Sequence, residues 1–293
     1  MGRRAEAAGL IVLAAFAIAS SVIVTRLGFS AMSPLMFATV RLVLASLLFT
    51  PFLVARRACL PRTRRLWLDL AWLGAFNTAL PIVTSIASLA YISSTMIALI
   101  YALMPAATGL IAYWALHSER LTRPKIAGLV VAGAGAVLLL LSGSTGIPDV
   151  AFDWRGYALG ISGMLAASAS AVYIRRHLAN QDTWVLAGGQ HLFSVPPALA
   201  LVFAAEEVQQ LAGVAMEGWL QVVYVALMNS GVAFVSLLVL NQRFGAVPST
   251  LPSYLIPLMT AVLGAVVLGE IVTPAMLLGG VLIITGLAVY NRA

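Results

Sequence analysis

The sequence predicts an all-α integral membrane protein, on three observations. Hydrophobic residues make up 61% of the 293 positions and charged residues 9%, whereas roughly a quarter of the residues in soluble domains are charged. So few charges cannot form a water-facing surface. The apolar segments are long and unbroken, about the 20 residues that a helix needs to cross a hydrocarbon core of ~30 Å. They lack the strict alternation of a membrane β-barrel.

Ten such segments follow one another along the chain. The predicted spans are 8–27, 34–54, 68–90, 94–116, 124–142, 154–174, 184–204, 218–240, 246–268 and 274–291. The first resembles a signal peptide because Arg3 and Arg4 precede it, but its apolar run is long for one. The sequence Thr25-Arg26-Leu27 also does not read as a cleavage site of small residues. We therefore interpret 8–27 as a retained first span.

The basic residues gather on one side of these spans. Fourteen of the 17 Lys and Arg residues fall there: Arg3, Arg4, Arg56, Arg57, Arg62, Arg64, Arg65, Arg120, Arg123, Lys125, Arg175, Arg176, Arg243 and Arg292. Six acidic residues fall on the other side: Asp149, Asp153, Glu206, Glu207, Glu217 and Glu270. Because cytoplasmic loops carry the excess of Lys and Arg, both termini are expected in the cytoplasm. One span more or fewer would destroy this asymmetry.

The two halves of the chain resemble each other. Asn77 precedes Pro105 by 28 residues, and Asn229 precedes Pro257 by 28 residues. Further counterparts, offset by 150 to 151 residues, are Glu119 and Glu270, Pro124 and Pro274, Gly128 and Gly279, and Gly135 and Gly286. Residues 1–142 and 143–293 are thus expected to be two five-helix repeats. Five is odd, so the second repeat enters the membrane inverted, as in carriers that work by alternating access around a central cavity.

Some of these elements resemble a known family. Residues 37–41, of sequence FATVR, and a proline-bearing fourth or ninth span that runs into Glu119 and Leu121 or Gly269 and Glu270 are similar to elements of EamA-type drug/metabolite transporters. Many members carry a Trp-Gly pair in the first span, where this chain has residues 18–21, of sequence IASS. The resemblance implies a ten-helix transporter in the bacterial inner membrane. It is greatest to exporters of aromatic and other neutral amino acids. Exporters of drugs or of nucleoside- or purine-like metabolites, and a passive channel, remain as alternatives.

Polar and aromatic side chains inside the spans are the candidate substrate contacts. The predicted set is Arg41, Asn77, Pro81, Ser85, Tyr101, His191, Asn229, Phe234, Ser253 and Tyr254. Helix packing is the alternative role, because small and polar residues also hold membrane helices together. A cavity is favoured because polar faces occur in repeat-related pairs on spans three and eight and on spans four and nine.

Four residues in the spans have more specific alternatives. Arg41 either extends toward the membrane surface or holds a substrate carboxylate. His191, the only histidine within a span, is expected to be a hydrogen-bonded packing residue rather than a proton carrier. Pro105 and Pro257 each remove a backbone donor from a helix. Their equivalent positions in the repeats predict a pair of hinges.

Other function classes find no support in the sequence. No Walker loop, metal-ligand spacing or nucleophile with a base is present, so we expect neither an enzyme nor a cofactor nor a metal. The net charge of +7 lies in short loops without a continuous basic stripe, which argues against nucleic-acid binding. The single cysteine, Cys59, excludes an internal disulfide. The expected partners are a small-molecule substrate and membrane lipid, and the protein is expected to be a monomer.

Overall fold

The fold was analysed in a computed structural model that describes residues 2–55, 63–116, 122–244 and 250–292. Several residues of the sequence prediction lie outside this range. They are Arg56, Arg57, Cys59, Arg62, Glu119, Arg120 and Leu121.

All the regular elements in the described ranges are helical. The helices are α1 (Gly2–Leu27), η1 (Gly28–Ser30), α2 (Pro34–Ala55), α3 (Arg64–Leu73), η3 (Gly74–Ala79), α4 (Leu80–Ser88), α5 (Ser94–Ala102), α6 (Met104–Leu116), α7 (Arg123–Leu141), α8 (Trp154–His177), α9 (Thr183–Ala204), η4 (Glu207–Gly213), α10 (Met216–Val225), η5 (Ala226–Ala233), α11 (Phe234–Phe244), α13 (Pro252–Leu268) and α14 (Pro274–Arg292). Joined across their irregular turns, they give eight helices long and apolar enough to cross a membrane, and two shorter apolar ones at 252–268 and 274–290. All ten overlap predicted spans.

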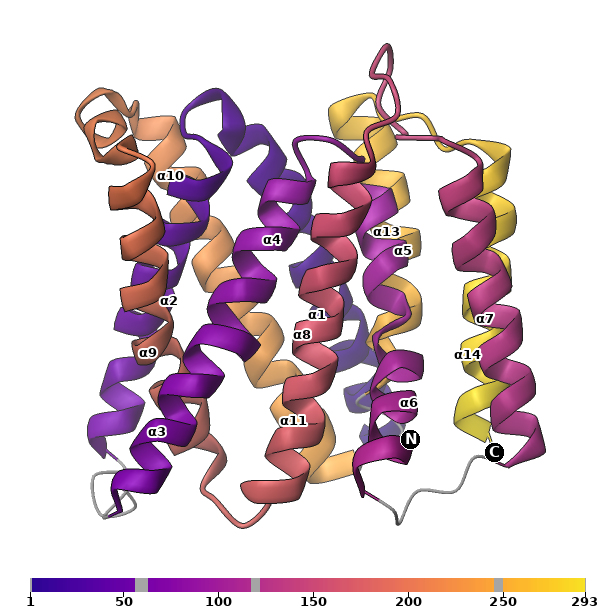
Figure 1. The fold of residues 1–293 in the computed structure, drawn as a ribbon, viewed down its shortest axis with the longest axis horizontal. Coiled ribbons are helices and arrows are strands. Elements are labelled where there is room, and N and C mark those ends of the chain that lie inside the picture. Colours follow the sequence, from indigo (N-terminus) through magenta and orange to yellow (C-terminus); the bar gives the residue numbers. More distant parts are fainter. Residues whose placement is uncertain (1, 56–62, 117–121, 245–249, 293) are drawn as a thin grey trace.

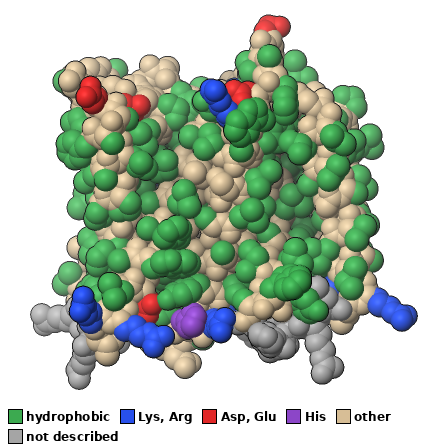
Figure 2. Space-filling view, viewed as in Figure 1, with side chains coloured by type: hydrophobic (Ala, Val, Ile, Leu, Met, Phe, Trp, Pro, Cys, Tyr) green, Lys and Arg blue, Asp and Glu red, His purple; other side chains and the backbone are tan. Residues whose placement is uncertain are grey.

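The long helices run side by side between two ends of the molecule, where the connecting loops lie (Figure 1). Both chain termini lie at the same end. On the face shown in Figure 2, hydrophobic side chains cover the middle of the molecule. Lys and Arg side chains gather along the end where the termini lie, and Asp and Glu side chains lie mostly along the opposite end. This separation is the one that the sequence predicts, with the basic residues at the end where the termini lie.

Two helices contain a π-helical segment in the middle. η3 connects α3 to α4, and η5 connects α10 to α11. Gly74 and Ala226, their first residues, are 152 positions apart, and the fourth residue of each segment is an asparagine, Asn77 or Asn229. π-helical turns are rare and occur frequently at functional sites. The two asparagines that the repeat pattern matched therefore occupy the same irregular backbone.

The two halves pack against each other in reciprocal pairs. α1 of the first half lies against α13, and α8, the corresponding helix of the second half, lies against α5 and α6. In the same way α1 contacts α10, η5 and α11, while α8 contacts α4 and η3. The most extensive contacts of all join α7 to α14 and α2 to α9. The core of the molecule thus lies between the halves rather than within each.

The contact between α7 and α14 depends on glycine. A Cβ atom on Gly128 would lie 2.5 Å from the carbonyl oxygen of Gly286, and one on Gly135 would lie 2.6 Å from that of Gly279. Neither position could hold a larger residue unless the backbones moved apart. Small residues allow this close approach between membrane helices. The same four glycines are the repeat counterparts found in the sequence.

The fourth span is interrupted near its proline. α5 ends at Ala102 and α6 begins at Met104, with Leu103 between them. Pro105 lies in the first turn of α6, where its missing N–H donor costs no helical hydrogen bond. Pro257 instead lies inside the continuous helix α13. The two predicted hinge residues therefore have different backbone surroundings in this structure.

Candidate functional site

Arg41 is a buried cation in the middle of the bundle. It lies in the second turn of α2, and 8% of its surface is exposed. Its Nε atom has no hydrogen-bond partner among the described residues. A charged group away from water is costly unless it is paired, and such residues within membrane helices usually serve function. The guanidinium does not extend to the surface, so it is available to an anion that enters the bundle.

Two predicted site residues lie close to Arg41. Tyr101 of α5 and His191 of α9 are both near enough for electrostatic interaction with its guanidinium. The phenol of Tyr101 donates a hydrogen bond to the carbonyl oxygen of Pro81 at 3.1 Å and also interacts with the Ser85 hydroxyl. We call Arg41, Tyr101 and His191 the central polar cluster. It joins helices from both halves of the chain.

His191 is held in one orientation. Its Nδ1 atom lies 2.8 Å from the carbonyl oxygen of Ala187, and its ring stacks on Phe49 with centroids 4.5 Å apart. Because a carbonyl can only accept, Nδ1 carries the proton of the neutral ring and Nε2 is its acceptor nitrogen. The side chain is 7% exposed. It has the hydrogen bond and the packing expected of a structural histidine.

Asn77 is tied to the residue beside His191. Its Nδ2 atom donates to Oε1 of Gln190 at 2.7 Å, which connects η3 to α9. Gln190 is the sequence counterpart of Arg41 in the second repeat. Both residues are half-buried, and each amide can form further hydrogen bonds beside this one.

Aromatic rings cover the cluster on the side of α11. Phe234 meets Phe49 edge to face with centroids 5.1 Å apart, and it lies beside Trp184 of α9. Trp184 in turn stacks on Phe52. Phe234 was predicted from sequence as a substrate contact, whereas Phe49, Phe52 and Trp184 were not. The sequence does not distinguish these three rings as substrate contacts, because aromatic residues near helix ends are also typical of the membrane interface.

The other predicted contacts lie elsewhere in the bundle. Asn229 is half-buried in η5. The Ser253 hydroxyl donates to the Thr250 carbonyl oxygen, three residues earlier in the chain. The Tyr254 hydroxyl donates to the carbonyl oxygen of Leu287 at 3.3 Å and so points toward α14. Of the predicted contacts, the structure thus gathers seven at or beside the central polar cluster: Arg41, Tyr101, His191, Phe234, Asn77, Pro81 and Ser85. The two residues of α13 have their hydrogen bonds elsewhere.

One polar cluster was not predicted. Glu270, expected in an external loop, is 6% exposed and lies 3.1 Å from Arg26. It also accepts a hydrogen bond from the backbone N–H of Ser94 at 2.8 Å. A signal was present in the sequence, because Arg26 stands by itself near the acidic side of the membrane.

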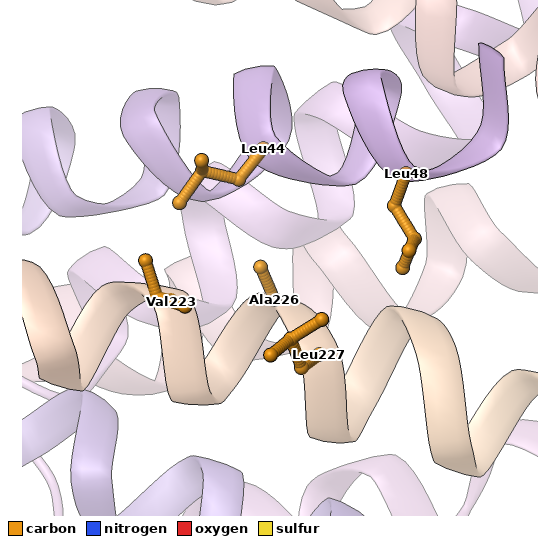
Figure 3. Close-up of a pocket in the computed structure, with 5 residues that line it drawn as sticks. All are labelled: Leu44, Leu48, Val223, Ala226 and Leu227. Atoms are coloured by element: carbon orange, nitrogen blue, oxygen red, sulfur yellow. The ribbon is translucent and has the colours of Figure 1, made fainter. Parts of the chain in front are cut away.

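Two surface hollows lie apart from these residues. The first is a groove between α2 and α10–η5 whose lining is entirely apolar (Figure 3). Its residues are Leu44, Leu48, Val223, Ala226 and Leu227. The second lies beside Glu217, before and within the start of α10. Neither offers a charged group at the depth of Arg41. Within the described ranges, no three His, Cys, Asp or Glu residues could hold a metal ion together.

Comparison with known sequences identifies the family. The sequence pattern of the EamA-like transporter family matches residues 6–141 and, a second time, residues 154–292. The chain belongs to the EamA-like transporter family. It is therefore a multi-pass membrane transporter, and the sequence-based assignment to this family is confirmed.

Two relatives extend the comparison. A curated "Probable terminal-alkyne amino-acid exporter" from Streptantibioticus cattleyicolor is 30% identical over 178 residues, which cover 59% of this transporter and 56% of that exporter. A crystal structure matches 98% of the transporter and 96% of its own chain, with a TM-score of 0.66 and 20% identity. At that identity the likeness shows the fold alone.

Proposed function

We propose that this transporter exports aromatic and other neutral amino acids across the bacterial inner membrane by alternating access. The observation that carries the substrate class is the buried guanidinium of Arg41, whose Nε atom has no hydrogen-bond partner among the described residues. A planar cation with several N–H donors is suited to a carboxylate. The curated relative is described as an amino-acid exporter, which agrees with a substrate that bears this group.

The surroundings of Arg41 favour a substrate without a positively charged side chain. No carboxylate among the described residues pairs with Arg41 or His191, so the cluster would repel a cationic drug. Phe49 and Phe234 offer apolar ring faces and edges beside it. Such surfaces suit an aromatic or aliphatic side chain. The ammonium group would be received by neutral acceptors, among them the Asn77 amide oxygen and backbone carbonyls near η3.

Three observations support alternating access by two inverted repeats. The family pattern matches the chain twice, once in each predicted half. The π-helical segments η3 and η5 recur at the spacing of the repeats. Gly128 contacts Gly286, and Gly135 contacts Gly279. The repeat counterpart of Gly128 is Gly279 and that of Gly135 is Gly286, so the two contacts between α7 and α14 are equivalent under the repeat. Reciprocal contacts of this kind are the mark of a two-fold axis.

The test is transport by the purified protein in liposomes. We expect saturable flux and counterflow of neutral amino acids, and little transport of their methyl esters, which lack the carboxylate. Arg41→Gln should weaken transport about ten- to a hundredfold, since a hydrogen bond to a charged group contributes ~1.5–3 kcal/mol. Leu47→Ala, on an exposed position of the same helix, is the matched control.

Three results would contradict the proposal. Equal transport of acids and esters would remove Arg41 from substrate recognition. Saturable transport of cationic drugs or nucleosides, without transport of amino acids, would favour the other exporter classes. Flux that neither saturates nor shows counterflow would indicate a passive channel.

A further inference from the structure

Glu270 has the most enclosed carboxylate in the described part of the chain. It lies between α13 and α14, and five donors on three residues surround it, the weakest being the Thr95 backbone N–H at 3.4 Å. Arg26 donates from α1 at 3.1 Å. Ser94 donates through its backbone N–H at 2.8 Å and through its hydroxyl, and the Thr95 hydroxyl lies at 3.3 Å. A carboxylate at the first turn of a helix also interacts favourably with the helix dipole, so Glu270 holds α5 at its N-terminus.

Backbone hydrogen bonds reinforce the same place. The Ile271 N–H donates to the carbonyl of Gly146 at 3.0 Å, and the Ser93 N–H donates to that of Thr145 at 2.8 Å. Arg26 also donates to the carbonyl oxygen of Ile92 at 3.2 Å. The loop before α5, the loop before α8 and the loop before α14 are therefore joined at the non-cytoplasmic end of the bundle.

These contacts cross between the halves. Arg26 and Ser94 belong to the first half, and Glu270 belongs to the second. The other ion pair in the described ranges, Arg243 with Glu6 at the cytoplasmic end, has side chains that are 65% and 45% exposed. An exposed pair contributes little to holding two elements together. Of the two ion pairs in the described ranges, the one at the outer end is therefore the buried one.

We propose that Arg26, Glu270 and Ser94 form an outer latch, which closes the extracellular side of the transporter and opens once in each transport cycle. The proposal rests on the alternating-access function argued above. Two halves that pivot about a central site must separate at each end in turn. All groups of the latch bond well to water, so their separation exchanges hydrogen bonds rather than losing them. An apolar seal of the same size would lack this property.

The latch is connected to the central polar cluster through α5. Ser94, Ala98 and Tyr101 follow one another at steps of four and three residues, so they lie on one face of this helix. Tyr101 belongs to the cluster, and Ala98, 6% exposed, lies between it and the latch. When the outer end opens, this face of α5 becomes accessible from outside.

Accessibility of a cysteine at position 98 tests the latch without any knowledge of the substrate. In a Cys59→Ser background, Ala98→Cys would be treated in spheroplasts with a membrane-impermeant thiol reagent. We expect slow labelling in this protein, and labelling about tenfold or more faster when Glu270→Gln is added, because the carboxylate then loses a charged hydrogen bond. Ser94→Ala, a milder change in the same cluster, should accelerate labelling in the same direction.

The matched control is Glu217→Gln, the same substitution at an exposed acidic residue on the same side. It should leave the labelling rate unchanged. Size-exclusion chromatography and circular dichroism establish that each variant is folded. If Glu270→Gln is not folded, the labelling rate of the Ser94→Ala variant tests the latch. Unchanged labelling in a folded latch variant overturns the proposal, and so does an equal increase in the control. Either result leaves the amino-acid transport assay unaffected, so the two proposals fail separately.

Discussion

Asn77 donates a hydrogen bond to Gln190 at 2.7 Å and thereby connects the π-helical segment η3 to α9. The bond joins the two halves of the chain next to His191 and the central polar cluster. Its position suggests two roles for Asn77, one in packing and one in substrate binding. The two roles predict different measurements.

We expect Asn77→Ala to weaken substrate binding several-fold and to destabilise the fold only slightly. A hydrogen bond between membrane helices contributes on average ~0.6 kcal/mol, so the coupling between Asn77→Ala and Gln190→Ala in unfolding should be about that size. Substrate-concentration dependence of transport and a double-mutant cycle in denaturant measure the two effects. Asn180→Ala, in a surface loop, is the control. Unchanged substrate binding in Asn77→Ala would leave only the packing role.

Much of the fold follows from the sequence because the lipid solvent imposes a simple rule. Every backbone polar group within the membrane must be paired, so a long apolar run can only be a helix. The family pattern matches residues 6–141 and 154–292, one match within each of the two predicted repeats. Glycine and proline are informative here because their backbone properties do not depend on the partner helix.

The irregular backbone and the latch could not be predicted in the same way. Nothing in the residues of η3 or η5 distinguishes a π-helical turn from an α-helical one, because the choice depends on the helices packed around it. Arg26 and Glu270 are 244 residues apart, and only the packing of α1 against α13 brings them together. Charge counting placed both near the outer surface and could not show that they are buried.

The glycines between α7 and α14 give a prediction for stability. Gly135→Ala should lower the free energy of unfolding by about 1–3 kcal/mol, because its Cβ atom would lie 2.6 Å from the Gly279 carbonyl oxygen and force the helices apart. Gly133→Ala, in the same helix with nothing within 4 Å of the added atom, should be neutral or slightly stabilising. Thermal unfolding in detergent compares the two. Equal effects would show that the close contact does not control stability.

The two prolines of the repeats give a prediction for rate. Pro105→Ala and Pro257→Ala should each slow transport with little loss of folded protein, since straightening either helix biases the transporter toward one access state. Pro51→Ala, at an exposed position within α2, serves as the control. Initial rates of counterflow in liposomes are the measurement. Parental rates in both variants would make the prolines packing features.

The charge asymmetry gives a prediction for topology. Cys59 lies in the loop with the most arginines and is therefore expected in the cytoplasm. An impermeant thiol reagent should leave it unlabelled in intact cells and label it after lysis. Labelling at the same rate in both preparations would invert the orientation, and with it the assignment of the latch to the outer side.

The surroundings of His191 give a prediction for the driving force. Proton-coupled carriers usually place a carboxylate or histidine within the membrane, where its charge changes as access changes. In the described ranges His191 has no acidic partner: its Nδ1 atom is bonded to the Ala187 carbonyl, its ring stacks on Phe49, and Arg41 is the nearby charge. A proton on His191 would put a second cation beside Arg41 in apolar surroundings, which is unfavourable. We therefore expect facilitated transport that follows the substrate gradient. Liposomes with equal substrate on both sides and an imposed pH step should show no accumulation of a zwitterionic amino acid, with or without His191→Ala. Accumulation that follows the pH step and disappears in His191→Ala would show instead that this histidine carries the proton.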